Sequence, residues 1–261
     1  MLIGMMNDPS KEVKEELKFA GEAGFDFLDL TVEPPKAKVE DIEVEELVSL
    51  CKKYKLKLVG HTSFDLQWAS PVRNVYKGTF AELENIFALF ERLKVKKVTL
   101  HPHWFQPNSP KEEIINRNIE SLRKIVKLGE KYSLKVLLEN VPNGFLSYLE
   151  NFQKIFQKVE NLGFHLDVGH CAVVALRKGV QPEKEVERFL RNLGDRLSHV
   201  HLSDVKKEDD HLPLGAGIID WKKCLELLKK VEYNDTITLE IFVKDREYLI
   251  LSKRKIESFV S

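Results

Sequence analysis

The chain has 261 residues, of which 43% are hydrophobic and 31% are charged, a size and composition that can bury one large core. Lysine and arginine total 41, as do aspartate and glutamate, so the formal charge is zero. No basic tail or block is present, and nothing supports a non-specific grip on nucleic acid. The three cysteines are scattered, without a Cys-x-x-Cys pair, which argues against a disulfide framework and suits a reducing cytosol.

No apolar run approaches the roughly 18 residues that a membrane-spanning helix needs. Residues 1–9 lack a basic region and reach a polar turn too early for a signal peptide. We therefore expect a cytoplasmic protein that has no membrane partner.

Eight short apolar segments are rich in Val, Ile, Leu or Phe without strict alternation, as in strands buried on both faces of a parallel sheet. They are Leu2–Met6, Phe25–Val32, Leu56–Gly60, Lys97–Leu100, Lys135–Leu138, Phe164–Val168, Leu197–Leu202 and Thr236–Ile241. Amphipathic helical segments separate them, and eight such repeats in about 250 residues predict a (β/α)8 TIM barrel of the α/β class. We expect residues 1–261 to form this barrel as a single domain. A doubly wound open sheet is the alternative, but the chain lacks the Gly-rich phosphate turn after the first strand.

Capping residues mark the start of three predicted helices. Ser10 can cap the helix that follows the first strand, and Asp220 can cap the helix that begins near Trp221. The segment Ser109-Pro110-Lys111-Glu112 has the pattern of a capping box with proline at the first helical position. The longest loops from strand to helix are expected at the C-terminal face of the barrel, where such enzymes build their sites.

Six consecutive predicted strands, the third to the eighth, each end in a side chain that can bind a divalent metal. These side chains are His61, His101, Glu139, Asp167, His201 and Glu240. In a parallel barrel all six ends surround the same mouth, and burying so many ionisable groups without a cation is costly. Each residue alone could be an ordinary buried group bonded to the backbone, but six in phase predict a metal site.

Three further residues extend the predicted site. His170 follows Asp167 by three residues at a glycine turn, and Asp209 and His211 form an Asp-x-His pair after the seventh strand. An Asp-x-His pair in a loop fits a solvated acidic turn equally well. The segment Leu214-Gly215-Ala216-Gly217 follows it, and its glycines allow a close approach of the backbone at the barrel mouth.

Taken in order, these pieces resemble the xylose isomerase-like barrel superfamily, which joins sugar isomerases and epimerases to the endonuclease IV family of abasic-site nucleases. The matching segments are His61-Thr62-Ser63-Phe64, Leu100-His101-Pro102, Leu138-Glu139-Asn140, Leu166-Asp167-Val168-Gly169-His170, His201-Leu202-Ser203-Asp204, Asp209-Asp210-His211, Leu214-Gly215-Ala216-Gly217 and Leu239-Glu240. They extend from the third predicted strand to the eighth.

For the nuclease branch, the resemblance implies three zinc ions that clamp a phosphodiester and activate a bridging hydroxide. The three ligand sets would be His61, His101 and Glu139; then Glu139, Asp167, His201 and Glu240; then His170, Asp209 and His211. Two segments depart from the nuclease pattern: the first strand, and the short acidic loop at residues 31–35, where a nuclease has a basic DNA-reading loop. Acidic side chains there would repel a phosphate backbone.

For the isomerase branch, the resemblance implies a single Mn, Mg, Co or Zn ion on Glu139, Asp167, His201 and Glu240. Glu139 and Glu240 would also move a proton beside a carbonyl, and His170 would contact substrate hydroxyls. We predict this branch: a sugar or sugar-phosphate isomerase or epimerase that uses one to three divalent ions, with Zn or Mn favoured. DNA is a partner only under the nuclease alternative, and an oligomer is possible.

A barrel that binds metal but has lost catalysis is a third hypothesis, disfavoured because both candidate acid/base glutamates remain. His165 and His199 share strand parity with Asp167 and His201, and we expect them one layer deeper, as hydrogen-bonded core residues. The loop aromatics Trp68, Trp104, Phe105 and Phe145 could pack on a sugar face or simply on the rim of the barrel.

Overall fold

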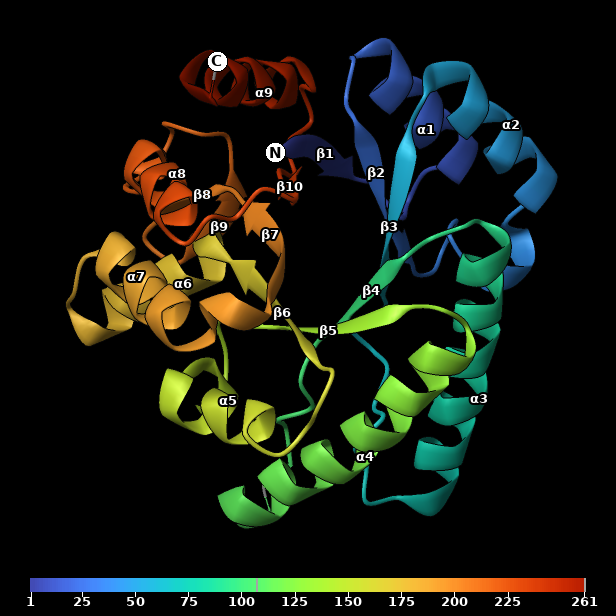
Figure 1. Cartoon of the computed structure of the whole chain (residues 1–261), viewed down its shortest axis with the longest axis vertical. Coiled ribbons are helices and arrows are strands. Elements are labelled where there is room, and N and C mark those ends of the chain that lie inside the picture. The colour runs from blue at the N-terminus through green and yellow to red at the C-terminus, as the bar shows by residue number, and fades with distance from the viewer. Residues whose placement is uncertain (107, 261) are drawn as a thin grey trace.

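The computed structural model describes residues 1–106 and 108–260, and its parallel strands close into the predicted TIM barrel (Figure 1). The strand order around the barrel is β1-β10-β7-β6-β5-β4-β3-β2. The strands are β1 Leu2–Met6, β2 Phe27–Val32, β3 Lys57–Thr62, β4 Lys97–Leu100, β5 Lys135–Glu139, β6 Gly163–Asp167, β7 Leu197–Leu202 and β10 Thr236–Leu239. All eight predicted strands are present, with ends that differ by a few residues.

Helices surround the barrel, as Figure 1 shows. They are α1 Val13–Glu22, α2 Val44–Tyr54, α3 Arg73–Arg92, α4 Lys111–Lys131, α5 Leu149–Phe156, α6 Val168–Lys178, α7 Pro182–Leu193, α8 Trp221–Lys230 and α9 Glu247–Val260. Short 3-10 turns lie at Val39–Asp41, Phe145–Ser147 and Gly194–Arg196. No helix in the part of the chain that the structure describes is long and apolar enough to span a membrane.

Two elements at the barrel mouth were not predicted. Helix α6 begins at Val168, directly after β6, where we expected the strand to continue into a glycine turn. Its first residues are buried on every side, so the sequence shows no amphipathic stripe there. In the loop after β7, strands β8 Asp204–Lys206 and β9 Asp209–Leu212 form an antiparallel hairpin.

Of the three predicted caps, only one is confirmed. The Asp220 side chain accepts a hydrogen bond from the Lys223 backbone N–H at 3.0 Å, at the start of α8. Helix α1 begins only at Val13, and the Ser10 hydroxyl instead donates to Asp8 at 2.6 Å. The predicted capping box before α4 is wrong because Pro110 occupies the cap position and no side chain caps the helix.

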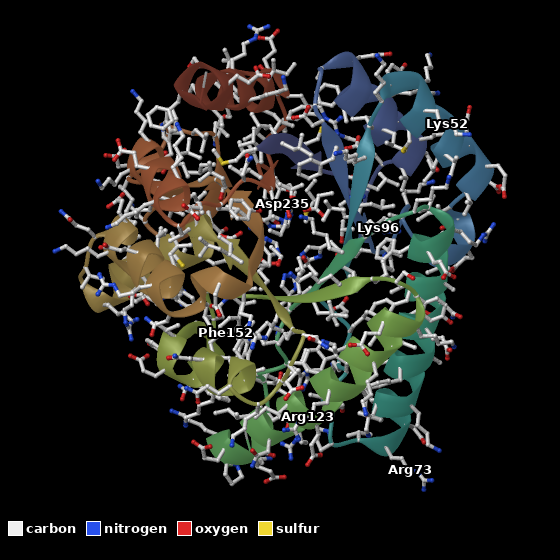
Figure 2. The ribbon with its side chains drawn as sticks, in the orientation of Figure 1. Lys52, Arg73, Lys96, Arg123, Phe152 and Asp235 are labelled. Atoms are coloured by element: carbon white, nitrogen blue, oxygen red, sulfur yellow. The ribbon has the colours of Figure 1, made fainter. Side chains whose placement is uncertain are left out.

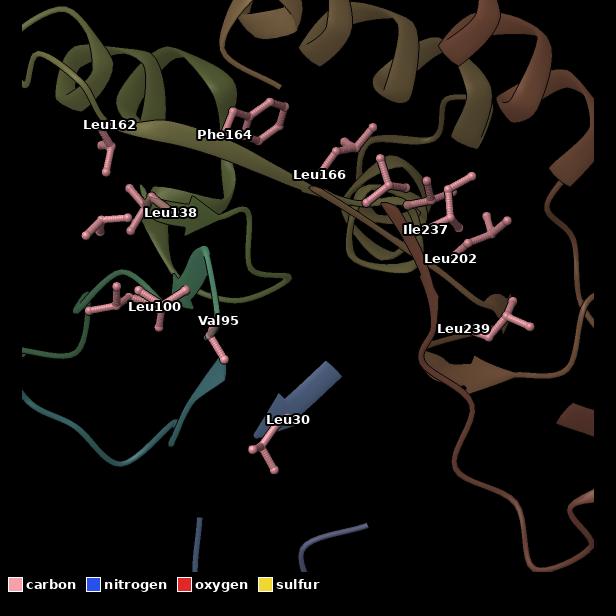
Figure 3. Packing of buried hydrophobic residues seen from close by; sticks show 14 of the residues in the cluster. Leu30, Val95, Leu100, Leu138, Leu162, Phe164, Leu166, Leu202, Ile237 and Leu239 are labelled. Atoms are coloured by element: carbon pink, nitrogen blue, oxygen red, sulfur yellow. The ribbon is translucent and has the colours of Figure 1, made fainter. Parts of the chain in front are cut away.

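The outward face of each strand carries the apolar side chains that hold the helices. Leu138, Leu166 and Leu202 are fully buried in the layer between strands and helices (Figure 3), and each is next in sequence to a polar residue that faces inward: Glu139, Asp167 and His201. Burying each leucine contributes about 1.5–3 kcal/mol, and a slip by one residue would exchange the two faces. Gly60 is outward too, since a Cβ there would collide with the ring of Phe90 on α3. This parity directs the metal-competent side chains into the barrel.

The barrel interior is polar along much of its axis. Fully buried inward-facing side chains include Asp29 on β2, Thr99 on β4, His165 on β6, His199 on β7 and Thr238 on β10. They lie below the strand ends and bond to one another. The metal-competent cluster at the mouth therefore rests on a hydrogen-bonded layer rather than on aliphatic packing; this cluster consists of His61, His101, Glu139, Asp167, His201 and Glu240.

Candidate metal centre and active site

Side chains from the C-terminal ends of six strands meet at one mouth of the barrel. Ligand atoms of four of them all lie within 4.8 Å of one another: Glu139, Asp167, His201 and Glu240. Glu139 also forms a second group of this kind with His61 and His101. Together, the two groups contain all six residues that we predicted as metal ligands from the ends of the strands.

Glu139 is the shared member of these groups and is 1% exposed. Its carboxylate lies 3.1 Å from His61 Nε2, 3.2 Å from His101 Nε2 and 3.3 Å from His170 Nδ1. Burial disfavours the carboxylate, but His165 and His101 lead the histidines that outweigh burial and hold the pKa of Glu139 well below its usual value. Glu139 is therefore ionised and can donate electron pairs to a cation.

His201 connects the metal-competent cluster to a carboxylate that the sequence analysis missed. Its Nδ1 lies 2.9 Å from Glu240, and its Nε2 lies 2.9 Å from Asp29 Oδ2 on β2. Metal-binding histidines commonly place their second nitrogen against such a carboxylate, which fixes the ring and raises its basicity. Asp29 lies within the apolar strand Phe27–Val32, where it shares parity with Thr31, a residue that faces the barrel mouth.

Asp29 continues the hydrogen bonding down the barrel axis. Its Oδ2 lies 2.8 Å from His199 Nε2 and accepts from the Thr238 hydroxyl at 2.8 Å. His199 Nδ1 lies 2.6 Å from the Thr236 hydroxyl, which in turn accepts from Lys97 Nζ at 2.6 Å. The ring of His201 is thus held by a chain of buried contacts that reaches the opposite end of the barrel.

Asp167 is held at the start of α6, with one carboxylate oxygen left over. The Asn140 side chain bonds both the Asp167 N–H, at 2.8 Å, and the Asp167 carbonyl, at 2.9 Å. Asp167 Oδ1 accepts from the His170 N–H at 2.6 Å, whereas the buried Oδ2 has no hydrogen-bond partner among the described residues. Burial is the largest cause that raises the pKa of Asp167 well above its usual value, and repulsion from Glu240 and Glu139 adds to it. The positive charge of His170 opposes this rise without cancelling it. An unbonded oxygen and crowded carboxylates both fit a divalent cation at this position.

A third group combines His170 and His211 with Asp210, in place of the Asp209 that the sequence analysis selected. Asp209 is exposed and pairs with Lys206 across the β8–β9 hairpin, so its side chain points away from the group formed by its neighbour. His211 has a left-handed backbone with φ of 57°, which interrupts the alternation of the strand. This allows consecutive residues, Asp210 and His211, to face His170 together.

The hairpin is anchored by Asp204, which begins β8. Its carboxylate accepts hydrogen bonds of 2.8–3.0 Å from four backbone N–H groups, those of Val205, Gly215, Gly217 and Ile219. The two glycines of the Leu214–Gly217 segment therefore wrap around this carboxylate. The Asp204 carboxylate therefore connects two of the segments that resemble the superfamily, His201–Asp204 and Leu214–Gly217. Its hydrogen bonds also position the hairpin whose second strand carries Asp210 and His211.

We expect Gly217→Ala to destabilise the protein by about 1–3 kcal/mol because the added methyl group has no space. A Cβ at this position would lie 2.1 Å from the Val205 carbonyl oxygen and 2.4 Å from the Asp204 carboxylate. Thermal unfolding measures the effect. Gly78→Ala is the matched control, because Gly78 lies inside α3 with nothing within 4 Å of an added Cβ, and it should stabilise the helix by up to about 1 kcal/mol. Equal melting temperatures for the two variants would contradict the contact.

A cavity of about 690 Å³ opens in front of the metal-competent cluster. His61, His101 and Glu240 form part of its wall, together with Phe64 and Phe242, which are 63% and 52% exposed. The ring of Phe64 packs against His101 and that of Phe242 against His211. The cavity therefore combines acid/base and metal-competent groups with apolar faces.

The loop aromatics singled out from the sequence lie elsewhere. Trp68 is 1% exposed and belongs to the core, so it cannot present a face to a ligand at the mouth. Trp104, Phe105 and Phe145 line a separate cavity of about 520 Å³. Of the two aromatic residues that do line the cavity at the mouth, Phe64 belongs to the matching segment His61–Phe64, so its position near the site could have been inferred from the sequence. Nothing in the sequence around Phe242 indicated that it lies there.

The sequence profile of the xylose isomerase-like TIM barrel family matches residues 17–256. The uncharacterized protein MJ1311 of Methanocaldococcus jannaschii is 32% identical, over 76% of this chain and 68% of that protein. A D-psicose 3-epimerase of Ruminiclostridium cellulolyticum is 25% identical over 89% and 79%, and a probable endonuclease 4 of Aster yellows witches'-broom phytoplasma is 24% identical over 74% and 71%. The crystal structure of a D-tagatose 3-epimerase-like protein superposes with a TM-score of 0.85 and 25% identity, and the match covers 100% of this chain and 97% of that one.

Proposed function

We propose that this chain, which belongs to the xylose isomerase-like TIM-barrel family, is a divalent-metal-dependent isomerase or epimerase of a sugar or sugar phosphate. The observation that carries the proposal is the group of Glu139, Asp167, His201 and Glu240 at the barrel mouth. Similarity to D-psicose 3-epimerase and to a D-tagatose 3-epimerase-like structure supports a ketose as the substrate class.

These four residues would hold the ion that the reaction needs. Three carboxylates and an imidazole suit several divalent metals, including Zn and Mn, and the unbonded Asp167 Oδ2 supplies a free ligand atom. A divalent ion bound there would polarise the substrate carbonyl and stabilise the negative charge of an enediolate.

Glu240 is the better placed of the two proposed acid/base groups. It lines the cavity, and although burial opposes ionisation, His201 and His211 lower the pKa of Glu240 so that it is a carboxylate at neutral pH. It would take the proton from the carbon beside the carbonyl, breaking the C–H bond and leaving the electron pair in the enediolate. Glu139, which is a carboxylate at rest, would take up a proton from solvent and donate it to the other face of that carbon, which would invert the centre.

Solvent deuterium incorporation tests this proposal. Protein loaded with Mn²⁺ or Zn²⁺ is incubated in D2O with D-psicose, D-tagatose and a panel of ketose phosphates, and exchange at the carbon beside the carbonyl is followed by NMR. We expect exchange in at least one substrate, dependent on the metal. The absence of exchange from the whole panel with fully loaded protein would reject the proposal.

A trinuclear phosphodiesterase acting on abasic DNA is the second candidate, because three of the five potential metal groups among the described residues correspond to the three ligand sets of the nuclease branch, with Asp210 in the place of Asp209. They are His61, His101 and Glu139; Glu139, Asp167, His201 and Glu240; and His170, Asp210 and His211. The zinc-loaded protein should be assayed on an oligonucleotide with one abasic site alongside the ketose panel. Cleavage there without exchange in any ketose would replace our proposal with this one.

Metal loading should release protons, and the affinity for metal should rise with pH. Although burial opposes protonation, Asp167 and Glu139 raise the pKa of His170 to about 10, and Glu240 leads the groups that raise the pKa of His201 well above its usual value. Both imidazoles are therefore protonated at neutral pH in the metal-free protein, and each must lose its proton to bind a metal.

Calorimetric titration with Zn²⁺ in two buffers of different ionisation enthalpy counts these protons. We expect at least one proton released at pH 7, and an affinity that rises about tenfold per pH unit for each one. His170→Asn should remove one proton from the count if His170 binds an ion, and none if it does not. An enthalpy that is identical in the two buffers would contradict the assigned protonation.

A further inference from the structure

We propose that the barrel has a second ligand site at its opposite end, a cavity that binds a small amphipathic organic anion. The cavity has a volume of about 770 Å³ and lies among the starts of β3, β4, β7 and β10 and the ends of α2 and α3. Its size is within the range of small-molecule sites. None of its lining residues belongs to the metal-competent groups, because those groups lie at the other ends of the strands.

Positive charge is concentrated around this cavity. Seven lysines line it, against a single acidic residue, Asp235: Lys52, Lys55, Lys57, Lys94, Lys96, Lys97 and Lys135. Figure 2 shows Lys96 and Asp235 near the barrel axis and Lys52 farther out on α2. A chain whose formal charge is zero therefore carries a strongly basic site at this end.

Most of this charge is uncompensated. Lys97 is 2.9 Å from Asp235 and also donates to the Ser198 carbonyl and the Thr236 hydroxyl. None of the other six lysines has a carboxylate within 4.0 Å among the described residues. Like charges around one chamber repel each other, and an anion that enters it relieves that repulsion.

Helix ends explain only part of the cluster. Lys52 lies in the last turn of α2, and Lys55 follows that helix, where a positive charge complements the helix dipole. Lys57, Lys97 and Lys135 instead belong to the first residues of β3, β4 and β5, which have no such dipole. Their convergence on the cavity is what indicates an anionic ligand.

The walls of the cavity indicate that the ligand also has an apolar body. Aliphatic side chains from four different parts of the chain form them, including Leu2, Val48, Leu56, Leu58, Leu93 and Leu197. Lysines suit such a site because their long stems can lie on the apolar wall while the ammonium groups reach the anion. An inorganic ion alone would leave this apolar surface wet.

Titration with 8-anilinonaphthalene-1-sulfonate, an amphipathic anion, tests the proposal by fluorescence and calorimetry on the full chain. Its uncharged counterpart N-phenyl-1-naphthylamine has the same aromatic body without the sulfonate. We expect one saturable site for the anion, weakened about tenfold by the Lys52→Glu/Lys96→Glu double variant, which should leave binding of the neutral probe unchanged.

Lys229→Glu/Lys230→Glu, at the end of α8, makes the same change of charge at a helix end outside the cavity and should have no effect. Val48→Trp should abolish binding of both probes by filling the chamber, while metal content stays that of the parent protein. The proposal is overturned if the sulfonate does not saturate one site or if both double variants weaken it equally. It is also overturned if a single-stranded oligonucleotide binds at the lysines while the sulfonate does not.

Discussion

Glu139→Gln should abolish deuterium exchange into the ketose, with a loss of at least about 10³-fold, and should weaken metal binding. Glu139 is the residue that both metal groups at the strand ends share, and three histidine nitrogens lie within 3.3 Å of its carboxylate. A neutral amide offers one oxygen, and its NH2 group would face imidazoles that are arranged around an anion. Exchange rate and bound metal, measured on the same sample, give both effects.

Glu240→Gln is the informative comparison for that variant. It belongs to one of the two groups, lies at the cavity wall, and has the more direct role in the proposed proton transfer. We expect it to lose exchange by at least about 100-fold while it retains more metal than Glu139→Gln. If Glu139→Gln kept both its metal and its exchange rate, the shared position of Glu139 would have no functional meaning.

Asp29→Asn should lower metal affinity by about 10- to 100-fold and destabilise the fold by several kcal/mol. Burial alone would raise the pKa of Asp29, but His199 and His201 outweigh it and hold that pKa well below its usual value. Its Oδ2 is the oxygen that meets both imidazoles and the Thr238 hydroxyl. An asparagine would keep an acceptor oxygen there but would remove the negative charge, and its NH2 group would replace the buried Oδ1, which has no hydrogen-bond partner among the described residues. The His201 ring would then lose its fixed orientation.

Glu185→Gln is the control, because Glu185 is also a buried carboxylate, but it pairs with Lys178 and Arg188 between α6 and α7. It should destabilise the protein without changing metal affinity once the folded fraction is taken into account. Chemical denaturation and metal titration separate the two effects. An Asp29→Asn protein that binds metal as tightly as its parent would show that Asp29 has no role in positioning His201.

The strand ends were predictable from the sequence because one physical rule governs them all. At β5, β6 and β7 an outward aliphatic residue directly precedes the inward candidate ligand, as Leu166 precedes Asp167 and Val200 precedes His201, and a parallel barrel brings all such ends to one mouth. The same rule located His61 and His101, and the role of all six residues as metal ligands stays a prediction.

Asp29 and Asp210 could not be predicted in the same way. Asp29 lies inside a strand rather than at its end, so strand-end counting does not reach it. Choosing Asp210 over Asp209 required the β8–β9 pairing and the left-handed backbone of His211, neither of which has a local sequence signature. Helix α6 was missed because its apolar residues are buried on every side, which gives the same pattern as a buried strand.

Anomalous diffraction from crystals of the Mn²⁺-loaded protein tests the metal centre most directly. We predict a strong peak bounded by Glu139, Asp167, His201 and Glu240, with ligand distances typical of Mn–O and Mn–N bonds. Additional peaks at His61, His101 and Glu139, or at His170, Asp210 and His211, would show how many ions the protein binds. Fully loaded crystals with no peak among these four side chains would contradict the assignment of this barrel mouth as a metal centre.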